Sequence, residues 1–73
     1  MEKIEIYTDF ITLGQFLKLS GIINNGGEAK KFIEMNKILV SNEAENRRGR
    51  KLRDGDTVEL LNKKILIVKK NEN

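Results

Sequence analysis

Five of the seven residues from 47 to 53 are basic, and this cluster is the strongest chemical signal in the chain. The sequence has 14 Lys and Arg among 73 residues, so an average window of seven would hold about 1.3 of them. Arginine predominates here, and its planar guanidinium can donate two parallel hydrogen bonds to one phosphate. The cluster favours contact with a polyanion, and the alternative is a solvated loop on an ordinary basic protein. Its bases are Arg47, Arg48, Arg50, Lys51 and Arg53.

The net charge of +3 is unevenly distributed along the chain. Residues 47–73 hold nine bases and four acids, whereas residues 1–46 hold five bases and seven acids. Like charges at this density repel one another in the folded protein unless a partner supplies anions. The distribution therefore favours one local polyanion-binding surface over a uniformly basic exterior.

Asn25-Gly26-Gly27 precedes a predicted helix and forms the second candidate site. Backbone amides at a helix N-terminus can donate to a phosphate oxygen, and glycine leaves them unshielded. The spacing matches neither a Walker loop nor a dinucleotide fingerprint, so we do not expect a nucleotide substrate. The glycines are equally well explained by a sharp turn between two helices.

Three lysines could extend the basic face from this second helix toward the arginines. Taken alone, each of them is better explained as a solubilising surface residue, and the same holds for Lys18 on the first helix. The three are Lys30, Lys31 and Lys37.

Enzymatic chemistry is not expected. The chain has no Cys and no His, which excludes thiol nucleophiles, disulfides, imidazole acid–base catalysis and the usual zinc sites. Asp54-Gly55-Asp56 pairs two carboxylates, but Asp-Gly is a standard turn dipeptide and no third oxygen-rich position lies near it. We expect no cofactor and no bound metal.

We expect one cytoplasmic domain over residues 1–73, because the chain has no proline, no repeat and no apolar run near the ~20 residues that span a bilayer. Hydrophobic periodicity and turn residues predict two short helices and five strands. The helices are expected over residues 12–20 and 25–35, and the strands over residues 2–7, 38–40, 51–53, 57–61 and 65–68. Turns are expected at residues 41–43, 54–56 and 62–64, and a frayed tail over residues 69–73.

The helix ends carry recognisable signals. Thr12 and Gln15 have the spacing of a capping box, in which a hydroxyl and a side-chain amide satisfy the first amides of a helix reciprocally. Asn25 and Glu28 repeat this spacing at the second helix. Gly21 is expected to end the first helix in a left-handed conformation, and Asn36 is expected to do the same for the second.

The aromatic residues bear on the kind of polyanion. Phe16 and Phe32 fall on predicted helix stripes and are expected in the core, which leaves Tyr7 and Phe10 as possible surface rings. Single-strand binders stack bases on several exposed rings, so phosphate geometry must carry recognition here. Sequence-specific DNA binding would call for a longer recognition helix, so structured RNA is favoured.

The order of elements and three strings at their junctions resemble the S4-type RNA-binding domain, or alpha-L motif. The strings are Thr12-Leu13-Gly14-Gln15-Phe16-Leu17-Lys18, Gly26-Gly27 with Ala29-Lys30, and Asn46-Arg47-Arg48-Gly49-Arg50-Lys51-Leu52. The chain is most similar to the stand-alone YaaA-like S4 domain proteins, and the resemblance covers residues 12–60. Many family members have Ser-Arg where this chain has Asn25-Gly26, which shifts expected RNA contacts onto Lys30, Lys31 and the arginine cluster.

The resemblance implies an α+β fold in which two short helices pack on a small, mostly antiparallel sheet. It also implies a non-enzymatic module that binds structured RNA, with ribosomal RNA or a ribosomal subunit as the expected partner and a role in ribosome assembly. Two alternatives stay open: docking of the basic cluster onto an acidic protein, and DNA binding as an accessory factor in replication or chromosome maintenance.

Overall fold

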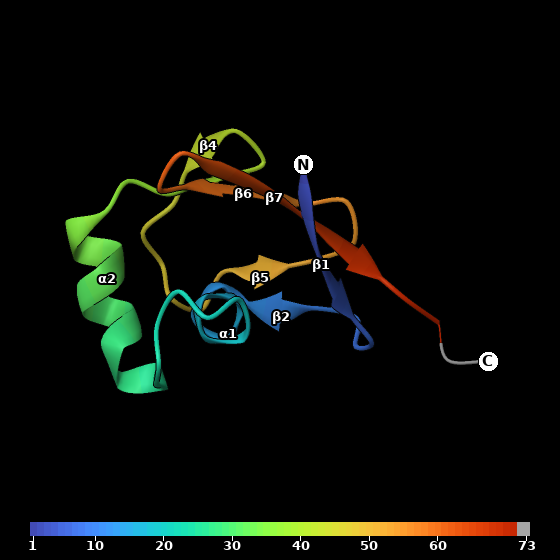
Figure 1. Cartoon of the computed structure of the whole chain (residues 1–73), viewed down its shortest axis with the longest axis horizontal. Helices are drawn as coiled ribbons and strands as arrows, with labels where there is room; N and C mark the ends of the chain where they lie inside the picture. Colours follow the sequence, from blue (N-terminus) through green and yellow to red (C-terminus); the bar gives the residue numbers. More distant parts are fainter. Residues whose placement is uncertain (72–73) are drawn as a thin grey trace.

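The computed structural model describes residues 1–71, which form two sheets and two short α-helices (Figure 1). The strands are β1 Glu2–Ile6, β2 Ile11–Thr12, β3 Leu39–Val40, β4 Glu43–Ala44, β5 Lys51–Leu52, β6 Thr57–Leu60 and β7 Lys63–Lys69. A five-stranded sheet has the order β1-β7-β6-β3-β4, and β2 pairs with β5 in a second sheet. Only the β1–β7 pair among these described strands is parallel, so the predicted α+β class and mostly antiparallel sheet are confirmed.

Helix α1 spans Leu13–Leu19 and begins with the predicted capping box. The amide of Gln15 donates to Thr12 Oγ1 at 3.1 Å, and the amide of Thr12 donates to Gln15 Oε1 at 2.8 Å. Gly21 follows the helix with φ +80°, the left-handed conformation that its missing Cβ permits. Both predicted ends of this helix are confirmed.

The second helix begins as a 3₁₀ turn, η1 Gly26–Glu28, and continues as α2 Ala29–Met35. Asn25 Oδ1 accepts from the amide of Gly27 at 3.0 Å, so the predicted asparagine cap is present. The prediction for Asn36 is wrong, because its backbone is extended at φ −133°. Its side-chain amide instead donates to the carbonyl of Phe32 at 2.9 Å, which ends the helix while the chain leaves in the direction of β3.

Two tight turns use left-handed residues other than glycine. Ser41 and Asn42 have φ +47° and +71° between β3 and β4, which confirms the turn predicted there. Leu61 and Asn62 have φ +49° and +61° between β6 and β7, so that turn starts one residue earlier and ends two residues earlier than predicted, and Lys63 already belongs to β7. Paired positive φ values match the twist of the flanking strands in two-residue hairpins.

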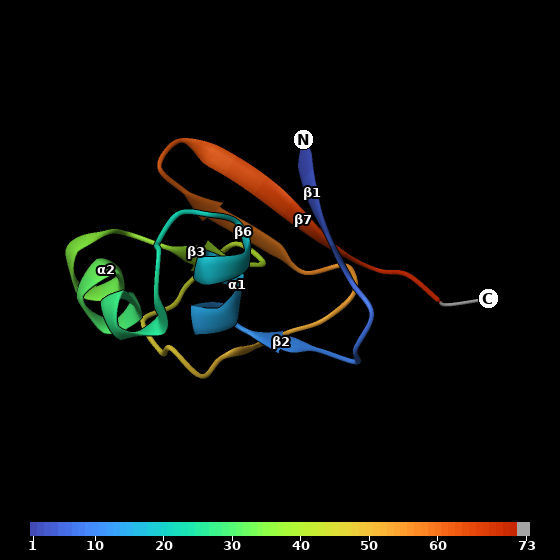
Figure 2. The same ribbon diagram turned by 60° about the horizontal axis from the view of Figure 1, so that its bottom comes forward.

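The core lies between the five-stranded sheet and the helices, which share one side of that sheet in Figures 1 and 2. Phe16, Leu13 and Leu17 of α1 are fully buried, as the helix stripe predicts. Phe32 is only partly buried, so it is a border residue of the core. The remaining buried core side chains are Ile6, Ile23, Ala29, Ile33, Ile38, Val40, Leu52, Val58, Leu60, Ile65 and Ile67.

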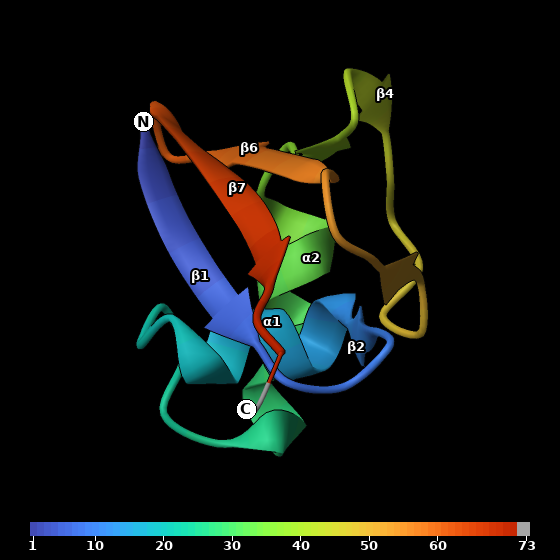
Figure 3. The same cartoon turned by 90° about the vertical axis from the view of Figure 1, so that its right-hand side faces the viewer.

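The predicted strand at residues 51–53 does not join the main sheet. Ile11 pairs with Leu52, and Thr12 pairs with Lys51, so this strand lies beside β2, which leads into α1 (Figure 3). In the expected tail, Lys69 belongs to β7 and the amide of Lys70 donates to the carbonyl of Ile6 at 2.8 Å, while residues 72–73 lie outside the described part. Within residues 1–71, neither helix combines the length and apolar character needed to cross a bilayer.

Candidate nucleic-acid interface

The segment from residue 45 to residue 50, which we call the basic loop, connects β4 to β5 and is fixed against the first turn of α1. The amide of Leu13 donates to the carbonyl of Arg50 at 2.8 Å, and the amide of Gly14 donates to the carbonyl of Arg48 at 2.9 Å. The first amides of a helix have no partner inside the helix, and here the loop supplies it. The helix thus positions the loop, and phosphate contacts at this helix must come from side chains.

Glu45 organises the basic loop from within. Its Oε2 accepts from the backbone amides of Asn46 at 3.1 Å and Arg47 at 3.0 Å. The same carboxylate accepts from Arg47 Nε at 2.9 Å and Nη2 at 3.0 Å, and from Arg50 Nη1 at 3.1 Å. The Glu45 side chain is 6% exposed, whereas that of Arg47 is 71% exposed and that of Arg50 30% exposed. The hydrogen bonds from Arg47 lower the pKa of Glu45 to about 2.

This ion-pair network gives two of the predicted site residues a structural role. Arg47 and Arg50 both belong to the predicted phosphate-binding cluster, yet their guanidinium groups share one internal carboxylate. Two cations against one anion leave a net positive charge, and Arg47 remains largely open to solvent. Both arginines therefore have a structural role in the loop, which the sequence prediction missed.

Arg48, Lys51 and Arg53 are the exposed members of the cluster whose charges stay available. Within residues 1–71, none of them forms a salt bridge with a carboxylate. Lys51 and Arg53 lie beside the ring of Phe10, with Lys51 Nζ 4.8 Å and Arg53 Cζ 5.2 Å from its centroid. Cation–π contacts of this length hold the two heads near the ring without neutralising them.

Gly14 allows the stem of Arg48 to lie across the first turn of α1. A Cβ added at Gly14 would come within 2.8 Å of Arg48 Cγ, which is shorter than real side-chain contacts. Because Cγ is close to the backbone, the whole Arg48 side chain would have to change rotamer to make room. Gly14 is a positioning residue for this arginine.

Replacing Gly14 with Ala should separate arginine placement from helix stability. Alanine is favoured over glycine by up to about 1 kcal/mol inside a helix, and the displacement of Arg48 offsets this gain, so the thermal midpoint should change little. Affinity for RNA should fall about 5-fold, because the displaced Arg48 loses one charge-assisted contact worth about 1 kcal/mol. Thermal melts and filter binding on ribosomal RNA measure the two effects. Unchanged affinity would show that the position of Arg48 does not matter.

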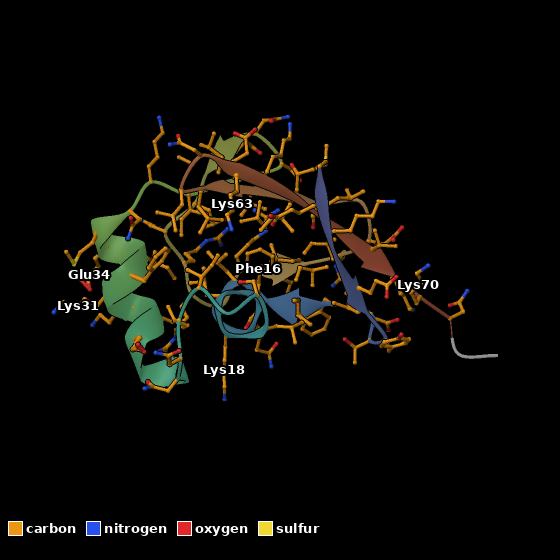
Figure 4. All side chains as sticks on the ribbon, in the orientation of Figure 1. Phe16, Lys18, Lys31, Glu34, Lys63 and Lys70 are labelled. Carbon is orange, nitrogen blue, oxygen red and sulfur yellow. The ribbon has the colours of Figure 1, made fainter. Side chains whose placement is uncertain are left out.

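A surface hollow brings together the basic loop and the start of the second helix. Arg48 and Gly49 line it from one side and Gly26 from another, so two separately predicted parts of the site meet here. Lys18 lines the same hollow, and Figure 4 shows its side chain extending from α1 away from the five-stranded sheet. The sequence interpretation set Lys18 aside as a solubilising lysine. Its spacing of four residues from Gly14, on one helix face, was the available signal.

The amides around Gly26 and Gly27 are partly occupied by local side chains. The Gly27 amide already donates to Asn25 Oδ1, and Glu28 Oε2 accepts from the amide of Asn24 at 3.3 Å. The second contact differs from the expected capping box, in which Glu28 would reach back to Asn25. Gly26 therefore contributes to the shape of the hollow, whereas the neighbouring amides of Asn24 and Gly27 are already bonded to side chains.

The three lysines predicted to extend the basic face are not gathered at the hollow. All three are exposed, and Figure 4 shows Lys31 projecting with Glu34 from the side of α2 that faces away from α1. Lys37 follows α2 and lines a different hollow together with Glu45 and Asn46. Lys30 lies one residue beyond Ala29, which lines the hollow shared by Arg48 and Gly26.

A second basic hollow adjoins the first through Gly49, which lines both. The basic residues that line this second hollow are Arg47, Arg50, Lys51 and Arg53. Asp54 and Asp56 also line it, and they hold the turn before β6. Asp56 accepts from Ser41 Oγ and the amide of Arg53, both at 2.8 Å, and Asp54 accepts from the amide of Lys69 at 2.8 Å. Among residues 1–71, no group of three potential ligands gathers to hold a metal ion.

The fold and this basic surface define the class of protein. The family model described as S4 domain matches residues 4–68, and the chain belongs to that family. The match contains the whole stretch, residues 12–60, over which the sequence resembles the alpha-L motif.

One relative is similar over most of its length. The chain is 56% identical over 57 residues to a protein of Bacillus subtilis (strain 168) named Probable ribosome maturation protein RlbA. The aligned residues cover 78% of this chain and 80% of the relative.

Proposed function

We propose that this protein is a non-enzymatic, cytoplasmic RNA-binding module that acts on structured ribosomal RNA during ribosome maturation. Membership of the S4 domain family and the name of the Bacillus subtilis relative support a ribosome-related role. The observation that carries the proposal is the continuity of the basic surface: Gly49 joins the hollow of Arg48 and Gly26 to the hollow of Lys51 and Arg53.

The geometry suits a sugar-phosphate backbone better than base edges. Neither helix exceeds seven residues, and no long helix stands free to enter a groove among the described residues. The cations come from a loop and from Lys18 rather than from one helix face. RNA duplexes are commonly recognised in this way, through backbone shape and phosphates. In this proposal, Arg48, Lys51 and Arg53 are the main phosphate contacts, with Lys18 and the exposed edge of Arg47 and Arg50 beside them.

Binding to ribosomal RNA should depend steeply on salt. If about five phosphates are neutralised, affinity should fall about 100-fold between about 50 and 200 mM salt, with a slope of about 0.7 per contact. Filter binding on purified ribosomal RNA across this range measures the slope. Duplex DNA of equal length should bind more weakly.

Cosedimentation with ribosomal subunits, with and without ribonuclease, separates RNA from a protein partner. The proposal predicts that ribonuclease releases the protein from the particles. Two results together would contradict the proposal: an affinity that hardly changes with salt, and capture of a protein partner that persists after ribonuclease treatment.

A further inference from the structure

Phe10 lies at the border of the basic surface and is not part of the described core. Its ring contacts the heads of Lys51 and Arg53, and its carbonyl accepts from Thr8 Oγ1 at 2.8 Å. The two cations lie over the ring, which stays partly exposed. A partly exposed aromatic ring among cations is an arrangement on which nucleobases stack.

The ring opens onto an apolar hollow of about 780 Å³, within the range of ~300–1,000 Å³ that holds small ligands. Ile11 and Leu19 provide further apolar lining, and Leu19 is 58% exposed although it ends a helix that is otherwise well packed. Asp9 also lines the hollow, but its carboxylate accepts from Lys69 Nζ at 2.7 Å. The anionic charge at this edge is thus matched by a lysine.

The hollow is continuous with the surface assigned to RNA. Gln15 and Lys18 line both this hollow and the one shared by Arg48 and Gly26. A strand whose phosphates contact Lys18 and Arg48 would therefore pass the mouth of the Phe10 hollow. Lys18 and the apolar side chains of Phe10, Ile11 and Leu19 line the hollow together, which matches a nucleotide, because a nucleotide joins an anionic phosphate to an apolar ring face.

We propose that the hollow beside Phe10 binds one unpaired nucleobase of the RNA, stacked on the Phe10 ring, while Lys18 contacts its phosphate. This inference rests on the proposed function and makes it more specific: the target is a structured RNA with a bulged or flipped nucleotide next to the contacted duplex. Duplex RNA offers its phosphates, and an unstacked base adds an aromatic contact.

Two RNA hairpins of equal length test the proposal with the full chain. One is fully paired, and the other carries a single unpaired 2-aminopurine, whose fluorescence is quenched by stacking. The bulged hairpin should bind about 10-fold more tightly than the paired one, with quenching of its fluorophore. Phe10→Leu should abolish both the preference and the quenching, because leucine keeps apolar bulk without a ring face. Phe10→Trp should restore them.

Tyr7→Leu is the matched control, because Tyr7 is a 61% exposed ring outside the lining of the hollow. It should leave the preference and the quenching intact. Equal, salt-sensitive binding of both hairpins would overturn this inference while leaving the proposed function in place. Binding of neither hairpin at low salt would overturn both. An acidic peptide with an aromatic anchor that displaces the hairpin from the wild type but not from Phe10→Leu would assign the hollow to a protein, and would also overturn it.

Discussion

Replacing Arg48, Lys51 and Arg53 together by Gln should weaken binding to ribosomal RNA about 100-fold while leaving the protein folded. Each of these exposed cations lacks a carboxylate partner within residues 1–71, so its removal breaks no internal ion pair. The loss of three phosphate contacts at about 1 kcal/mol each gives the expected factor. The salt slope should also fall by about 2, because three fewer counterions are released.

A triple variant with the same change of net charge provides the control. Lys63, Lys64 and Lys70 pair with Glu2, Glu59 and Glu5 along the sheet, away from the basic loop. Their replacement by Gln should reduce affinity less than about 5-fold, through long-range charge alone. Filter binding and thermal melts on both variants measure affinity and folding. Equal losses in the two variants would mean that net charge, and not the position of Arg48, Lys51 and Arg53, determines binding.

Replacing Glu45 with Ala should destabilise the protein by about 2 kcal/mol and lower its thermal midpoint by about 10 °C. The change removes the acceptor of two guanidinium groups and two backbone amides, and it leaves Arg47 and Arg50 close together without an anion. Glu43→Ala is the control, because Glu43 is exposed on β4, two residues before Glu45, and its replacement should change stability by less than about 0.5 kcal/mol. Equal effects at the two positions would refute the organising role of Glu45.

The same carboxylate gives this stability a defined dependence on pH. The pKa of Glu45 is lowered from 4.5 to about 2 in the folded protein, so the folded state favours its ionised form. Its contribution is present above the unfolded pKa and is lost as the pH falls from about 5 to 2. The difference in free energy of unfolding between the wild type and Glu45→Ala should therefore be about 2 kcal/mol at pH 7 and shrink through that window. Denaturant unfolding at several pH values measures it.

Local signals in the sequence predicted the helices well. Two of these signals are interactions between residues within three positions of each other, namely the capping box of Thr12 and Gln15 and the cap at Asn25. The third is the left-handed conformation of a single residue, Gly21. Such interactions are determined by neighbouring side chains, so they can be read from the chain. Asn36 is the exception, because two outcomes were open to it locally. Its side chain caps the helix by bonding the Phe32 carbonyl, and its backbone then needs no left-handed conformation.

Features that depend on distant segments could not be predicted in this way. The pairing of Ile11 with Leu52 joins residues that are far apart, and together with the bonds from the amides of Leu13 and Gly14 it places the basic loop on the first turn of α1. Lys18 gains its place in the site through the same packing. The role of Glu45 was missed because the basic cluster was defined from residue 47. An acid two residues earlier can still form ion pairs with both arginines that follow it.

Ultraviolet crosslinking of the full chain to purified ribosomal subunits, followed by mass spectrometry of the crosslinked peptides, tests most directly whether one face holds the RNA. We predict crosslinks within residues 10–18 and 47–53, which meet on the surface around Gly49 and Lys18. Crosslinks confined to β1 and to residues 63–66 of β7, none of which lines these hollows, would contradict the account.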